Sequence, residues 1–158
     1  MKPDDPTELT PTVTLQGQLS RLLASLGSDD AGSVRGVFGA WPELVGEAVA
    51  ALGRLDHLVN NAGTAHVREP VAIQDLDAVT DELWDAVLAT NLRGTFACSR
   101  AAAPALKAAR GGITSIASVA GLTQPGSSMA YGASKAGVIS LTRNLARALA
   151  PELVGEAA

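Results

Sequence analysis

Tyr131 and Lys135 lie four residues apart, and both belong to residue types that are rare in this chain. Tyr131 is the single tyrosine, and Lys135 is one of three lysines. Residues i and i+4 share a face of a helix, so the ammonium can lie beside the phenol. A free phenol, with a pKa of about 10, is a poor base near neutral pH, but a fixed cation beside it favours the phenolate. The pair could therefore transfer a proton, although a half-buried tyrosine next to a solvated lysine would show the same spacing.

Polar residues also follow two predicted strands. Ser118 comes directly after the predicted strand 113–117, and Asn60-Asn61-Ala62-Gly63 closes the predicted strand 56–60. Ligands gather at the carboxyl ends of strands in a parallel α/β sheet, so both segments would lie at the same rim. A hydroxyl at this rim can donate to a substrate oxygen as charge develops on it. A serine that only caps a turn is the alternative interpretation of Ser118.

Asn91 is a further polar residue in an unexpected place. It lies within the predicted helix 81–110, in a largely apolar stretch, and asparagine is a poor helix former. A functional break in the helix would explain it, and so would a position facing solvent.

The elements that must position these residues follow from hydrophobic spacing and from breakers. We expect residues 1–11 to be a polar, flexible tail and residues 64–77 to be a loop. We expect strands at 12–16, 56–60 and 113–117, and helices at 18–27, 34–52, 81–110 (with irregularities at Gly94 and Pro104) and 132–150. This alternation predicts an α/β fold with parallel strands flanked by helices.

Composition restricts the class of protein further. At 158 residues the chain suits one domain, and 47% hydrophobic with only 3% aromatic residues predicts a modest core of small side chains. The net charge of −4, without a basic run, argues against a nucleic-acid partner. No apolar run is long enough for a membrane helix, and the amino terminus lacks signal-peptide features. The single cysteine, Cys98, is expected to be a buried small hydrophobe, and a cytoplasmic location fits best.

Four motifs together resemble the short-chain dehydrogenase/reductase family. They are NNAG at 60–63, TNLRGTF around Asn91, SIASVAG around Ser118, and YGASK from Tyr131 to Lys135. Their order and spacing match the family, and the similarity is strongest over 53–152. The resemblance implies a truncated Rossmann-like domain over residues 12–158, doubly wound and three-layered, with a short parallel sheet between helices.

The resemblance also implies an NAD(P)-dependent oxidoreductase acting on a carbonyl or secondary alcohol. Tyr131 would be the general acid/base, and Lys135 would stabilise its phenolate and bind the nicotinamide ribose. Ser118 would hold the substrate oxygen, and Asn91 would support a water-linked proton relay. Asn60, Asn61, Ala62 and Gly63 would line the cofactor together with Tyr131 and Lys135, and no metal is expected. Self-association through the helices 81–110 and 132–150 is also implied.

One family motif is missing from this sequence. The glycines before Asn60 never form the glycine-rich turn that holds the dinucleotide pyrophosphate in the family. We therefore expect weakened binding of NAD or NADP, and an inactive, truncated remnant that at most associates with other chains is the alternative function. A serine hydrolase is a poor interpretation, because Ser118 has no GxSxG around it.

Overall fold

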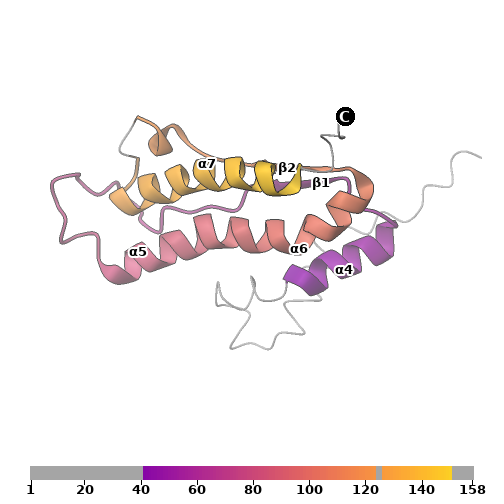
Figure 1. Cartoon of the computed structure of the whole chain (residues 1–158). Helices are drawn as coiled ribbons and strands as arrows, with labels where there is room; N and C mark the ends of the chain where they lie inside the picture. The colour runs from indigo at the N-terminus through magenta and orange to yellow at the C-terminus, as the bar shows by residue number, and fades with distance from the viewer. Residues whose placement is uncertain (1–40, 124–125, 151–158) are drawn as a thin grey trace, which may run out of the picture.

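The computed structural model describes residues 41–123 and 126–150. Its helices and strands alternate along the chain (Figure 1). In order they are α4 (Trp41–Leu52), β1 (His57–Asn60), α5 (Asp81–Leu88), the π-helical turn η1 (Ala89–Arg93), α6 (Gly94–Ala109), β2 (Gly112–Ser115), the 3₁₀ turn η2 (Val119–Gly121) and α7 (Met129–Leu149). The predicted α/β class is confirmed. The predicted tail, the strand 12–16, the helix 18–27 and the first residues of the helix 34–52 lie outside the described residues.

The two strands form a parallel pair. Leu58 lies opposite Ile113, and Asn60 lies opposite Ser115. Successive side chains of a strand point to opposite faces, so these four residues share one face of the sheet. The other face carries Val59, which is 55% exposed. Within the described part of the chain, only one face of the sheet is therefore well covered.

Helix α6 is the centre of the packing. It contacts both strands, α7 and α4. Figure 1 shows α5 and α6 as one long rod with α7 running beside it, while α4 lies near the end that leads into β2. The buried apolar residues are mostly small, as the composition predicts: Leu44, Val87, Cys98, Ala102, Leu106, Ala130 and Val138. The prediction that Cys98 is buried is confirmed, and this burial raises the pKa of its thiol to about 12.

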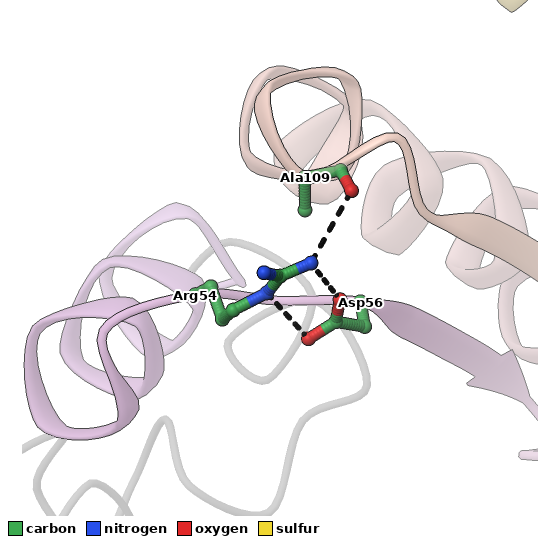
Figure 2. Close-up of polar contacts among 3 residues, drawn as sticks. All are labelled: Arg54, Asp56 and Ala109. Carbon is green, nitrogen blue, oxygen red and sulfur yellow. Dashed lines mark hydrogen bonds and ion pairs between the residues drawn. The ribbon is translucent and has the colours of Figure 1, made fainter.

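An arginine joins the start of β1 to the end of α6. Arg54 donates from Nε to Asp56 at 2.9 Å and also pairs with Asp56 through Nη2. The same Nη2 reaches the carbonyl of Ala109 at 3.4 Å (Figure 2). A cation near the carboxyl end of a helix complements the unpaired carbonyls there. Both groups of the ion pair are exposed, so the pair contributes little to stability.

The helices differ from the sequence predictions at the start of α7 and at the irregularity expected at Pro104, whereas the irregularity expected near Gly94 is observed as η1. Ser128 accepts a hydrogen bond from the Tyr131 amide, and α7 therefore begins at Met129 rather than at 132. The predicted helix 81–110 is divided by η1, whereas Pro104 lies inside α6 without ending it. None of the described helices is long and apolar enough to cross a membrane.

Candidate active site

The site begins where the two strands end. Because β1 and β2 are parallel and in register at Asn60 and Ser115, the segments that follow them leave from the same edge of the sheet. Asn61, Ala62 and Gly63 follow β1 and are exposed. The backbone amide of Ile116 donates to the Asn60 carbonyl at 2.9 Å, which keeps the two segments together for one more residue.

Asn60 is buried and faces the interior. Its amide nitrogen donates to the hydroxyl of Ser99 at 3.0 Å and to that of Ser115 at 3.3 Å. Both amide hydrogens are thus used within the protein. The side chain therefore ties β1 to α6 and to β2, which leaves the next three residues as the exposed part of the motif.

Asn91 lies in the π-helical turn and is 1% exposed. Its side-chain oxygen accepts from the Thr64 amide at 2.8 Å, and its nitrogen donates to the Thr64 carbonyl at 2.9 Å. The same nitrogen donates to the Ser134 hydroxyl at 3.0 Å. This side chain therefore fixes the loop after Gly63 to α7. The alternative interpretation, that Asn91 faces solvent, is therefore wrong.

Lys135 carries a buried charge beside this loop. The residue is 5% exposed, and its ammonium donates to the carbonyl of Ile116 at 2.8 Å. Burial lowers the pKa of Lys135. A Cβ added to Gly63 would lie 3.2 Å from Nζ and 3.4 Å from the side-chain oxygen of Asn91. An ammonium has three hydrogens, so those not used on Ile116 can serve a ligand at the edge of the sheet.

Tyr131 lies in the first turn of α7 and is half-buried. The Lys135 nitrogen is 5.8 Å from the centre of its ring. The ring also lies against Gly126, where an added Cβ would be 3.0 Å from a ring carbon. Gly126 has a φ of +70°, which suits glycine at this close approach. The structure therefore places the predicted phenol and ammonium next to each other.

Ser118 lies just before η2, which packs against α7. Its hydroxyl oxygen accepts from the Ala120 amide at 3.2 Å and keeps its own hydrogen to donate. Gly121 touches the backbone of α7 so closely that an added Cβ would lie 2.6 Å from the Ala136 nitrogen. The segment 116–121 thus contacts α7 at the turn that carries Lys135. Ser118 acts as a turn cap, as the alternative interpretation held, and it also lies in the segment that holds Lys135.

Two residues of this network were missed in the sequence. Thr64 offers its backbone to Asn91, and Ser134 accepts from Asn91 while donating to the Tyr131 carbonyl at 2.8 Å. Ser134 lies three residues after Tyr131, on the face that packs inward, and is fully buried. Its position inside the YGASK motif was the available signal. No comparable signal marks Thr64, because its backbone makes the contact.

The sequence of this chain matches the model of a known protein family. The model described as short chain dehydrogenase matches residues 37–155, well over half of the chain. The chain belongs to the short-chain dehydrogenase family. The resemblance drawn from four motifs is therefore confirmed.

Curated members of the family are similar to about two thirds or more of this chain. The trans-4-hydroxycyclohexanecarboxylate dehydrogenase of Sinomonas cyclohexanicum is 42% identical over 112 residues, which cover 71% of this chain and 41% of that protein. The 3-oxoacyl-acyl-carrier-protein reductase FabG of Thermotoga maritima is 38% identical over 109 residues, covering 68% of this chain and 42% of that protein.

A solved structure agrees with this relationship. A Burkholderia xenovorans protein described as a short-chain dehydrogenase/reductase superposes with a TM-score of 0.66 at 34% identity, covering 72% of this chain and 47% of that one. This short-chain dehydrogenase chain thus spans less than half the length of these relatives.

Proposed function

We propose that this protein is an NAD(P)-dependent oxidoreductase that interconverts a carbonyl and a secondary alcohol. The observation that carries the proposal is the buried Lys135 ammonium, held by the Ile116 carbonyl beside Gly63 and 5.8 Å from the Tyr131 ring centre. A buried charge costs free energy unless a ligand or partner uses it. The names of the two curated relatives, a dehydrogenase and a reductase, support this reaction class.

The residues around Gly63 fit a nicotinamide nucleotide. A Cβ at Gly63 would lie 3.2 Å from the Lys135 nitrogen, so glycine leaves open the space in front of the ammonium. Lys135 would donate to ribose hydroxyls there, and the exposed residues Asn61, Ala62 and Gly63 would line the same edge. Asn60 would hold these residues in place from the protein interior, because its side-chain amide already donates to Ser99 and Ser115. We leave the choice between NAD and NADP open.

Tyr131 is the proposed general acid/base. When bound, the nicotinamide supplies or accepts the hydride. In the direction of reduction, the Tyr131 hydroxyl would give its proton to the substrate oxygen while a hydride adds to the carbonyl carbon. In the direction of oxidation, the phenolate takes that proton back, and the nearby ammonium stabilises the negative charge.

Ser118 and Asn91 have supporting roles in this proposal. The free hydrogen of the Ser118 hydroxyl would point to the substrate oxygen, where negative charge grows during reduction. Asn91 is a positioning residue, because its side chain binds Thr64 and Ser134 within the protein. The water-linked relay expected around Asn91 remains part of the proposal.

The proposal extends to the whole chain. Residues 12–158 would form one partial Rossmann-like domain acting on a small carbonyl or alcohol, in a reducing cytoplasm that suits the single buried cysteine. Two copies would associate through the α5–α6 rod and α7. Exposed aromatic residues on that rod support the association, since Trp84 is 37% and Phe96 is 42% exposed.

Substitution of Tyr131 by phenylalanine tests the reaction. Loss of NADH and NADPH absorbance would be followed with a panel of ketones and aldehydes. We expect Tyr131→Phe to lower turnover by about 10²- to 10⁴-fold, the contribution of a general acid, while the cofactor still binds, because the ring is kept and Lys135 is untouched. Turnover that survives in Tyr131→Phe would contradict the assigned role. A chain that neither turns over nor binds either cofactor would instead support the inactive association module.

A further inference from the structure

One side of the proposed site is apolar and uncharged. The segment 111–134 includes both Ser118 and Tyr131, and it contains no Asp, Glu, Lys, Arg or His. Val119 and Leu122, at 66% and 69%, are the most exposed large hydrophobic residues of the described part of the chain. Apolar side chains left open beside a reacting group indicate a surface that a ligand covers.

The geometry of η2 brings these two side chains together. The Leu122 amide donates to the Val119 carbonyl at 3.0 Å, which is the three-residue bond of a 3₁₀ turn. Side chains three residues apart in such a turn eclipse each other. Gly121 occupies the side of η2 that packs on α7, since its added Cβ would lie 2.6 Å from the Ala136 nitrogen. Val119 and Leu122 therefore lie together on a side of η2 that does not face the α7 backbone.

The apolar surface continues from η2 to the Tyr131 ring. A Cβ added to Gly126 would lie 2.8 Å from the Cβ of Ala120 and 3.0 Å from a ring carbon of Tyr131. Ala120 lies within η2, directly after Val119, so its methyl group links the exposed side chains to the ring. We call the surface formed by four of these residues the apolar wall: Val119, Ala120, Leu122 and Gly126.

The charged residues of the neighbouring loop do not favour an anion at the apolar wall. The loop 64–79 is joined to the segment before α7, where the Val71 amide donates to the Ser127 carbonyl at 2.9 Å. In this loop, one arginine against three carboxylates gives a net charge of −2. An anionic group on a substrate would therefore lose water here without gaining a net positive partner.

We infer that the substrate is a carbonyl compound or alcohol with an uncharged, apolar substituent, such as an alkyl chain or ring, that lies on the apolar wall. This inference rests on the proposed function for the reaction and names the class of substrate that the same site accepts. Such a substituent removes Val119 and Leu122 from water, and each CH₂ group that is buried with them adds to affinity.

The single tyrosine of the chain gives a readout of binding that does not need turnover. The full chain, labelled with ¹³C in the tyrosine ring, would be titrated without cofactor, and the Tyr131 ring signals would be followed by NMR. The ligands are 2-butanone, 2-heptanone and 6-oxoheptanoate, in which a carboxylate replaces the terminal methyl of 2-heptanone. We expect 2-heptanone to bind more tightly than 2-butanone, by about fourfold for each additional CH₂ group. It should also bind at least about tenfold more tightly than 6-oxoheptanoate.

Substitutions on the apolar wall test whether it makes this contact. Val119→Thr and Leu122→Asn keep nearly the same side-chain size and make the wall polar. Because both residues are exposed, we expect both variants to fold. Each should weaken the binding of 2-heptanone at least about fourfold. Leu52→Asn is the matched control, because Leu52 is 63% exposed on α4, and it should leave this affinity unchanged.

Any of three results would overturn the inference. They are equal affinity for 2-heptanone and 6-oxoheptanoate, Tyr131 signals that no ketone shifts, and equal weakening by Leu122→Asn and Leu52→Asn. A second copy that covers the apolar wall would make the Tyr131 signals depend on protein concentration and not on ketone, which also contradicts the inference. Failure of NADH binding in the unmodified chain would count against the proposed function, while the Tyr131 signals would still decide what the wall binds.

Discussion

At the scale of single residues, the site is built around one buried cation. Lys135 is 5% exposed, and among the described residues its ammonium donates to a backbone carbonyl and pairs with no carboxylate. Hydrogen bonding to a carbonyl offsets only part of the cost of removing an ammonium from water. The protein therefore accepts a local loss of stability where the ligand is proposed to bind.

This cost predicts a dependence of stability on pH. Burial lowers the pKa of Lys135 below its ordinary 10.5, so between the lowered value and 10.5 the unfolded chain binds more protons than the native protein. The free energy of unfolding therefore gains a contribution that rises with pH through this window. Lys135→Met should lack that contribution. Urea unfolding of both proteins across alkaline pH would show it, and curves that stay parallel would contradict it.

The sequence was informative about these residues but not about their partners. Tyr131, Lys135 and Asn91 stood out because their types are rare or unfavourable where they occur. The residues that hold them are Thr64, Ile116 and Ser134, and two of these act through backbone atoms. Backbone contacts between segments far apart in the chain leave no mark on residue type, so they could not be predicted.

At the scale of elements, hydrophobic periodicity predicted where the helices and strands lie, but not all of their boundaries and internal irregularities. The strand predicted at 56–60 is observed at His57–Asn60, and the one predicted at 113–117 at Gly112–Ser115. The sequence left open a break in the helix at Asn91, and the π-helical turn lies there, but its hydrogen-bond pattern was not predicted. The early start of α7 depends on the Ser128 cap, which the polar loop before Tyr131 obscured.

The contact of η2 with α7 gives a prediction for Gly121. Its added Cβ would lie 2.6 Å from the Ala136 nitrogen, and backbone atoms at this distance must move. Gly121→Ala should therefore destabilise the protein by about 1–3 kcal/mol. Gly46→Ala is the control, because Gly46 lies within α4 with nothing near its Cβ, and alanine there should stabilise by up to about 1 kcal/mol. Equal effects of the two substitutions in urea unfolding would show that η2 does not hold this contact.

At the scale of the whole molecule, the described residues form a two-stranded parallel sheet that is well covered on one face only. The two-stranded sheet is covered on the face shared by Leu58 and Ile113, while Val59 on the opposite face is 55% exposed. The sequence predicted this fold class from the alternation of helix and strand. It could not predict how residues 1–40 contribute, because the family resemblance weakens before residue 33.

The exposed rod of α5 and α6 predicts self-association. Phe96 is 42% exposed, with the Arg100 guanidinium 5.5 Å from its ring centre. Phe96→Glu should convert an associated protein to a single chain in sedimentation velocity, because a carboxylate at a packed interface lacks a partner. Leu52→Glu on α4, where Leu52 is 63% exposed, should leave the mass unchanged. An unmodified protein that sediments as one chain would rule out this interface.

Titration with NADH and NADPH, followed by nicotinamide fluorescence, tests the central proposal that Lys135 faces a bound nucleotide. Charge-assisted hydrogen bonds contribute about 1.5–3 kcal/mol, equivalent to about 10- to 150-fold in affinity. We expect micromolar binding by the unmodified chain and by Lys107→Met, a lysine substitution in the last turn of α6. Lys135→Met should bind at least about tenfold more weakly. Absence of binding up to millimolar cofactor, or equal affinity in all three proteins, would contradict the proposal.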